Sequence, residues 1–305
     1  MTRYILLPAI VLLLLLGACI KHTSSGQSGT GTGTGNKDSP VAGTPIPDTF
    51  TTNKKGGCFS VQMNYGTWYV SDVSVQPFWY YNWATPLPSP ALQNCEFVSM
   101  FWGPGNMIGP NLQAVTAMKS QGQIKYVLGF NEPDQSSQSN MTVSQALSYW
   151  PQLESLGIPL GSPATSYPTV QWFTDFMDSV AAEKLRVDFI CVHMYVGTDD
   201  NNFVQVLQSV YNQYHLPIWI TEFGTADWNA QTPADNSYTP AEVLGFMQRL
   251  LPRLDSLNFV QRYSWFPGDP TNAAQWVSAL VDSYGQLTPL GTWYANYKPN
   301  TSVQQ

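Results

Sequence analysis

Two stretches of the sequence decide the fold: KYVLGFNEPD at residues 125–134 and LPIWITEFG at residues 216–224. In each stretch an apolar run typical of a buried strand gives way to a polar turn, and a glutamate, Glu132 or Glu222, stands near that change. A carboxylate that follows a buried strand lies at the carboxyl end of a sheet, where α/β proteins place their functional residues. The two glutamates can face each other there if the intervening chain folds back.

A pair of facing carboxylates is the arrangement that hydrolysis of a glycosidic bond requires, so the pair predicts an enzyme. Either glutamate alone could instead be a helix N-cap partner or a solvated loop residue. Only 11% of the chain is charged, and two acids at equivalent strand ends are therefore harder to explain as ordinary surface residues. Because strand side chains alternate between faces, we expect Glu222 to continue the face of Ile218 and Ile220.

The N-terminus has the pattern of a targeting segment. The basic residue Arg3 precedes an apolar run at residues 5–16, which is followed by GAC at residues 17–19. This pattern is typical of a secretory signal, and the cysteine after the small pair resembles the lipidation motif of bacterial lipoproteins. The alternative is a transmembrane anchor, but the run is shorter than the ~20 residues that a span needs. We predict a signal peptide at residues 1–18, lipidation at Cys19, and anchoring to the bacterial outer membrane or cell surface.

The next part of the chain has the composition of a tether. Residues 19–53 are rich in Gly, Thr, Ser and Pro and include GTGTGTG at residues 29–35. Such a segment buries too little apolar surface to offset its ordering entropy, so we expect it to be flexible. The remaining residues, 54–300, have the length of about 250 residues that is usual for one (β/α)₈ barrel, and we predict a single catalytic domain there.

Composition narrows the classes of partner. The formal net charge is −7 and the basic residues are scattered, so binding to nucleic acid is disfavoured. We expect contact with a membrane only through the predicted lipid. Aromatic residues make up 13% of the chain, and those beyond the needs of the core could stack on sugar rings. No Cys and His spacing suggests a metal site, and a disulfide between Cys58 and Cys95 is left open. We expect a monomer without cofactor.

Short apolar runs alternate with helical patterns along the domain. The candidate strands are residues 58–61, 78–83, 97–102, 126–130, 159–162, 187–192, 218–221 and 262–266. Capping boxes at Thr142 and Thr239 predict the starts of two helices, and further helices are expected at residues 111–121, 169–184, 202–214 and 272–284. Eight such repeats predict a (β/α)₈ TIM barrel. Residues 66–70 show little helical periodicity, so we expect a short or irregular first helix.

The strand ends, taken in order, resemble those of glycoside hydrolase family 128, with a catalytic domain described as Asl1-like. They read YNW at residues 81–83, FWG at 101–103, GFNEPD at 129–134, GSPA at 161–164, VHMY at 192–195, WITEFG at 219–224 and WF at 265–266. An Asn-Glu-Pro motif alone is shared by many retaining barrel glycosidases, but the whole ordered set is more specific. The resemblance implies a (β/α)₈ β-1,3-glucanase with a retaining mechanism and no cofactor.

The resemblance also implies roles for the site residues. Glu132 would be the general acid/base and Glu222 the nucleophile, and a retaining pair of carboxylates lies only ~5–5.5 Å apart. Asn131 would bond the sugar 2-hydroxyl, or it is simply a turn residue before Pro133. The function that the resemblance implies is hydrolysis of β-1,3-glucan. The alternatives are a retaining glycosidase for another β-glycan and a glucan-binding surface lipoprotein without turnover.

The remaining candidates are substrate contacts. His193 and Tyr195 are two apart on one strand and point the same way, so Tyr195 could hold Glu222 in its charged form. His193 would support the site or a sugar hydroxyl, or it is a structural histidine. The candidates at the other strand ends, which could equally be barrel packing, are Asn82, Trp83, Trp102 and Trp265. The polar segment at residues 227–238 is expected to form a loop beside the cleft.

Overall fold

The computed structural model describes residues 53–62, 67–107 and 109–299. The predicted signal peptide, Cys19 and nearly all of the predicted tether lie outside these residues, so their predictions stay as predictions. Within the described ranges, no helix is both long enough and apolar enough to cross a membrane.

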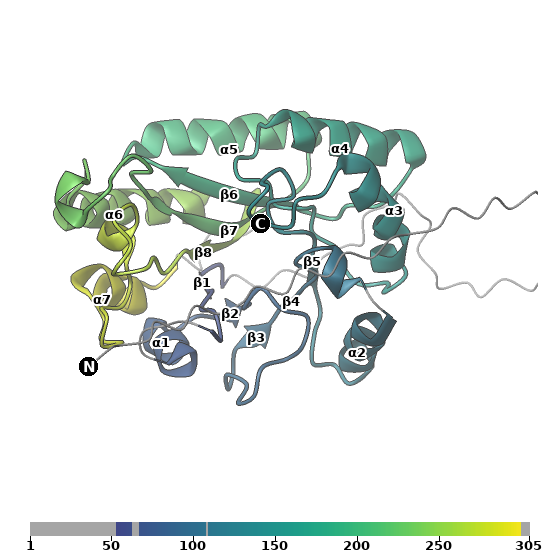
Figure 1. Cartoon of the computed structure of the whole chain (residues 1–305), viewed down its shortest axis with the longest axis horizontal. Helices are drawn as coiled ribbons and strands as arrows, with labels where there is room; N and C mark the ends of the chain where they lie inside the picture. The colour runs from purple at the N-terminus through teal and green to yellow at the C-terminus, as the bar shows by residue number, and fades with distance from the viewer. Residues whose placement is uncertain (1–52, 63–66, 108, 300–305) are drawn as a thin grey trace, which may run out of the picture. The chain divides into compact units, whose positions relative to one another are not determined.

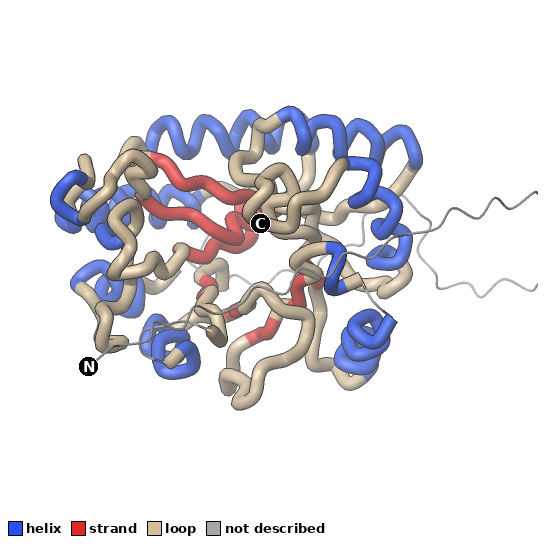
Figure 2. The backbone as a smooth tube through the Cα atoms, viewed as in Figure 1, coloured by secondary structure: helices blue, strands red, loops and turns tan. Residues whose placement is uncertain are grey.

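The named strands, which are red in Figure 2, pair only in parallel, as the α/β prediction requires. They are β1 (Gly56–Gly57), β2 (Trp79–Tyr80), β3 (Glu96–Phe97), β4 (Ser99–Met100), β5 (Val127–Leu128), β6 (Ile190–Val196), β7 (Ile218–Thr225) and β8 (Val260–Trp265). Single parallel bridges join Val127 to Leu160, Gly161 to Phe189 and Lys55 to Tyr263. The first strand begins before its predicted range, and the predicted strand at residues 159–162 is reduced to isolated bridges.

Helices surround these strands (Figure 1). They are α1 (Trp68–Val75), α2 (Gly109–Ser120), α3 (Val143–Glu154), α4 (Gln171–Glu183), α5 (Asp200–Tyr214), α6 (Pro240–Ser256) and α7 (Pro289–Asn296), with 3₁₀ turns at Pro104–Asn106, Pro233–Asp235 and Trp276–Ser278. The capping boxes at Thr142 and Thr239 are confirmed. The first helix is short as predicted: it has eight residues, and the Thr67 side chain does not cap it.

The helix predicted at residues 272–284 is wrong, because only the 3₁₀ turn at Trp276–Ser278 forms there. The backbone of this segment is paired elsewhere: the amide of Leu280 donates to Pro267 O, and Val281 bridges antiparallel to Leu287. Gly285, at φ +77°, lies in the reversal between the two bridged residues. These contacts with flanking segments override the local helical pattern.

Apolar side chains pack on both sides of the strands. An outer cluster, which includes Ile218, Ile220 and Phe223, lies between the strands and the helices. An inner cluster includes Trp79, Tyr126 and Trp219. The buried guanidinium of Arg262 lies 4.2 Å from the ring centre of Trp219 and 4.5 Å from that of Tyr126, and it forms a 2.8 Å ion pair with Glu96. The aromatic faces and the carboxylate compensate this charge for its loss of water.

Two buried lysines join the start of the first strand to the ends of α6 and α7. Lys54 Nζ donates to the carbonyls of Leu254, Asp255 and Leu257 at 3.0–3.2 Å, at the end of α6. Lys55 Nζ donates to the carbonyls of Tyr294, Ala295 and Tyr297 at 2.8–3.2 Å, at the end of α7. The last carbonyls of a helix have no partner within the helix and carry partial negative charge, so a cation is favourable there.

We predict that Lys55→Met lowers the free energy of unfolding by about 2–4 kcal/mol, because it keeps the aliphatic stem but leaves three buried carbonyls without a donor. Burial lowers the pKa of Lys55 to about 7, so the urea denaturation should be run at pH 6, where the ammonium is charged. Lys125→Met is the control. This exposed lysine has no part in either helix end, and we expect a change within about 0.5 kcal/mol. Equal effects of the two substitutions would contradict the capping role.

Candidate active site

The two glutamates lie at one cavity of about 950 Å³. Its wall also includes Trp83, Trp102, Asn131, Tyr195, Trp228 and Phe266, which come from segments far apart in the sequence. Parallel strands bring such segments together because their carboxyl ends share one edge. The cavity is therefore the place where the strand-end residues of this chain can act jointly.

A bulge in β7 turns Glu222 toward this cavity. Val192 of β6 pairs with Ile220, but His193 pairs with Glu222, so Thr221 is one residue extra on β7. Ile218 and Ile220 pack in the outer cluster, whereas Glu222 lines the cavity. The expectation that Glu222 continues the face of the isoleucines is therefore wrong, because the inserted residue reverses the alternation.

The backbone at Glu132 has a constrained conformation. Its φ of +39° lies in the left-handed region, which non-glycine residues seldom adopt. Its amide donates to Ala164 O at 2.6 Å, and the amide of Asn131 donates to Trp102 O at 2.9 Å. These bonds to the two neighbouring strand ends fix the place where the chain leaves the strand, and they direct the Glu132 side chain into the cavity.

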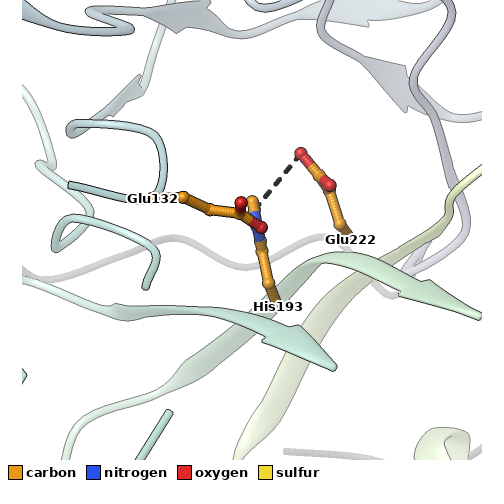
Figure 3. Close-up of side chains that lie close together, drawn as sticks. All are labelled: Glu132, His193 and Glu222. Atoms are coloured by element: carbon orange, nitrogen blue, oxygen red, sulfur yellow. Dashed lines mark hydrogen bonds and ion pairs between the residues drawn. The ribbon is translucent and has the colours of Figure 1, made fainter. Parts of the chain in front are cut away.

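His193 lies between the two carboxylates (Figure 3). Its Nδ1 is 2.9 Å from Glu132 Oε1 in a hydrogen bond, and its Nε2 is 3.4 Å from Glu222 Oε1. The second pair is within ion-pair range but is not aligned as a hydrogen bond, so its attraction is mainly electrostatic. Burial alone lowers the pKa of His193, but the charge of Glu222 and the hydrogen bond and charge of Glu132 raise it above its ordinary value.

The same three side chains bear on the question of a metal. Among the described residues, Glu132, His193 and Glu222 form the one group whose ligand atoms lie close enough to hold an ion, within 4.8 Å of one another. Their contacts already pair the two carboxylates with the imidazole. The acidic and basic side chains of this group thus already have one another as partners. The expectation that the protein binds no metal stays a prediction.

Three neutral donors surround Glu222. Tyr195 Oη donates to its Oε2 at 2.5 Å, and Trp83 Nε1 donates to its Oε1 at 2.7 Å. The single O–H of Tyr81 is shared between Thr221 O, at 3.1 Å, and Glu222 Oε1, at 3.4 Å. Burial and the charge of Glu222 raise the pKa of both tyrosines well above the ordinary value, so both keep their protons. Donors of this kind stabilise an ionised carboxylate. Tyr195 thus lies where the sequence predicted, while Tyr81 was not foreseen.

Two predicted site residues lie elsewhere. Trp265 is fully buried in the outer cluster, where its Nε1 donates to Ser278 O at 3.0 Å, so its predicted role as a sugar contact is corrected to core packing. Strand alternation explains this, because the next residue, Phe266, faces the cavity instead. Asn82 is also buried and is not part of the cavity wall.

Sequence reasoning missed one exposed aromatic residue. Trp228 lies in the polar loop after β7, is 59% exposed, and lines the cavity with its ring edge toward Tyr195. A tryptophan within an otherwise polar segment directly after a functional strand was the available signal. Cys58, Cys95 and Cys191 are free thiols, so the disulfide between Cys58 and Cys95, which the sequence left undecided, is absent.

Comparison with known proteins gives concordant results. Residues 62–294 match the family model described as glycosyl hydrolase catalytic core. Alkali-sensitive linkage protein 1 of Schizosaccharomyces pombe is 36% identical over 228 residues, which cover 71% of this chain but only 39% of that relative. This chain therefore spans well under half of that relative's length.

Solved structures are similar over most of the domain. A family 128, subgroup I endo-β-1,3-glucanase from Amycolatopsis mediterranei, in complex with laminaritriose, is 34% identical with a TM-score of 0.68, covering 80% of this chain and 98% of that one. A subgroup VII oligosaccharide-binding protein from Trichoderma gamsii is 24% identical with a TM-score of 0.63, covering 83% and 96%. The second likeness is one of fold alone.

The histidine between the carboxylates predicts a pH dependence of stability. Since the pKa of His193 is raised in the folded protein, its stabilising contribution is fully present below the unfolded value of about 6.5 and is lost as the pH rises through the folded value. The difference in unfolding free energy between wild type and His193→Gln should therefore shrink from pH 5.5 toward alkaline pH. Chemical denaturation across this range measures it, and other titrating groups cancel in the difference to first order.

His215→Gln is the matched control, since this exposed histidine ends α5 away from the carboxylates. Its difference from wild type should vary little with pH. A His193→Gln difference that stays constant, or grows, as the pH rises would contradict the placement of a charged imidazole between the two glutamates.

Proposed function

We propose that this chain, which belongs to the glycosyl hydrolase catalytic core family, hydrolyses β-1,3-glucan with retention of configuration. The observation that carries the proposal is the close approach of the two carboxylates, whose ligand atoms lie within 4.8 Å of each other. Retaining pairs are separated by ~5–5.5 Å, whereas inverting pairs stand ~6.5–9.5 Å apart to admit a water molecule. The separation therefore favours a double displacement.

In this mechanism Glu222 is the nucleophile and Glu132 the general acid/base. A Glu222 oxygen attacks the anomeric carbon while Glu132 gives its proton to the leaving glycosidic oxygen, which produces a covalent glycosyl-enzyme. Water then attacks the same carbon, Glu132 takes its proton, and Glu222 leaves as the carboxylate. Three donors on Glu222 suit a group that must be charged at both ends of this cycle.

The substrate class rests on the similar proteins and on the cavity wall. The Amycolatopsis mediterranei enzyme is an endo-β-1,3-glucanase that binds laminaritriose, and Trp83, Trp102, Trp228 and Phe266 give this cavity aromatic surfaces. Aromatic faces can stack on the apolar faces of sugar rings. Asn131 Oδ1 is buried without a hydrogen-bond partner, which suits its proposed contact with the 2-hydroxyl. Endo action is the form of cleavage that we propose.

We propose that the domain carrying this function is the closed (β/α)₈ barrel predicted from the sequence. Parallel pairing joins β1, β2 and β3 in one sheet, β4 and β5 in a second, and β6, β7 and β8 in a third. Single parallel bridges at residues 160–161 lie between the second and third sheets, and Lys55 pairs with Tyr263 of β8. Closure would place all eight strand ends around the one cavity.

Two alternatives can be tested against this proposal. A different β-glycan would use the same carboxylates, and a panel of laminarin, xylan and mixed-linkage glucan separates these substrates. A binding protein without turnover is suggested by the Trichoderma gamsii protein of similar fold. Binding to curdlan without release of reducing sugar over long incubation would favour that alternative.

We predict that Glu132→Gln lowers kcat on laminarin by about 10²–10⁴-fold, as expected for loss of a general acid. Glu222→Gln should lower it about a thousandfold or more, because the nucleophile is lost. Reducing-sugar release measures both rates. Glu183→Gln, an exposed carboxylate at the end of α4, is the control and should leave turnover unchanged. Turnover of Glu222→Gln at the wild-type rate would remove Glu222 as the nucleophile.

We also propose a secreted lipoprotein: a signal peptide at residues 1–18, a lipid on Cys19, a tether to residue 53 and anchoring at the outer membrane or cell surface. Palmitate labelling in a bacterial host should be lost in Cys19→Ser because the acceptor thiol is gone. Cys95→Ser should keep the label. Label that persists in Cys19→Ser would show that the anchor is not at this cysteine.

A further inference from the structure

We propose that Trp83 acts on the nucleophile rather than on the sugar alone: its indole N–H is a hydrogen-bond donor that stabilises the Glu222 carboxylate as it leaves the glycosyl-enzyme. This inference rests on the proposed function and gives a role to one residue of that site. The contact that carries it is the 2.7 Å hydrogen bond from Trp83 Nε1 to Glu222 Oε1.

The backbone of Trp83 is shaped for this contact. Its φ is +60°, in the left-handed region that bulky residues rarely adopt. Such conformations persist where the surroundings enforce them, and they gather at functional sites. The Trp83 ring is held by edge contacts with Tyr81, at 5.1 Å between centroids, and with Phe266, at 5.9 Å. The indole is therefore fixed with its N–H toward Glu222 before any substrate enters.

The charges around Glu222 make this donor important. Within the part of the chain that the structure describes, His193 is the one basic residue in ion-pair range of Glu222, and no arginine or lysine lies within that range. His193 Nε2 is not aligned to donate a hydrogen bond. The hydrogen bonds to the carboxylate thus come from neutral groups, and of the two that reach Oε1, the indole of Trp83 is closer than the hydroxyl of Tyr81.

The chemical consequence is specific to one step. When the glycosyl-enzyme breaks down, the bond between the anomeric carbon and the Glu222 oxygen breaks and its electron pair returns to the carboxylate. The water oxygen bonds to the carbon, and its proton passes to Glu132. A donor already directed at Glu222 stabilises the charge that develops there, so it accelerates this second step.

The kinetic test is Trp83→Phe, which removes the donor and keeps an aromatic ring. With a dinitrophenyl laminarioligosaccharide, whose good leaving group makes breakdown of the intermediate rate-limiting, kcat should fall about 10- to 100-fold, the range for losing one hydrogen bond to a charged group. The value of kcat/KM should fall less, and the burst of dinitrophenol should become more pronounced.

Trp102→Phe is the matched control, because Trp102 lines the same cavity and its indole has no hydrogen bond to Glu222. It should raise KM and leave the size of the burst unchanged. If Trp83→Phe instead lowers kcat and kcat/KM equally and leaves the burst unchanged, Trp83 only packs or binds sugar and the proposal is overturned. Melting curves confirm that both variants are folded.

A second measurement does not depend on glucanase activity. In protein labelled with ¹⁵N at the tryptophan indoles, the signal that disappears in Trp83→Phe identifies the Trp83 N–H. That signal should lie downfield in wild type and move in Glu222→Gln, where a neutral amide replaces the carboxylate. An unmoved signal overturns the proposal. Wild type without activity on any β-glucan would instead count against the proposed function, and the indole signal would still test the contact.

Discussion

The structure depends on two buried ammonium groups, which lie on the residues just before the first strand and donate to the carbonyls at the ends of α6 and α7. Lys54 and Lys55 each use all three N–H donors of the ammonium on backbone carbonyls, at the ends of α6 and α7 respectively. The first strand is thereby held beside the last one, where Lys55 also pairs with Tyr263. A parallel arrangement has no hairpin to join its first and last strands, so the two lysine side chains reinforce the backbone contact between Tyr263 N and Lys54 O.

Because the strands are held in fixed positions, a site with only a few charged groups can keep a defined geometry. Glu132 and Glu222 are fixed on different strands, and buried His193 contacts both from below the cavity. Neutral hydroxyl and indole donors then solvate Glu222 in place of water. Because these groups are held by strands and by aromatic packing, they need no reorganisation when charge moves between the two carboxylates, which is the physical basis of electrostatic preorganisation.

Much of the framework could be predicted from local patterns. The capping boxes at Thr142 and Thr239 start helices as expected, since a capping box satisfies backbone donors with side chains only three residues away. The helix predicted at residues 272–284 does not form, because the amide of Leu280 donates to the carbonyl of Pro267 instead. A pattern within the segment alone cannot reveal a bond to a residue outside it. The role of Trp265 failed for a related reason: the residue lies at the expected strand end, but on the face that packs under the helices.

The sequence by itself determined the alternation of strands and helices, the two glutamates, one after β5 and one within β7, and the short first helix, because each follows from composition and spacing within one segment. Only the tertiary structure decided which way the side chains face. Thr221 is an extra residue in the pairing of β7 with β6, and it directs Glu222 into the cavity instead of toward the helices. Such a bulge depends on register between strands, and register is set by packing between segments that are distant in the chain.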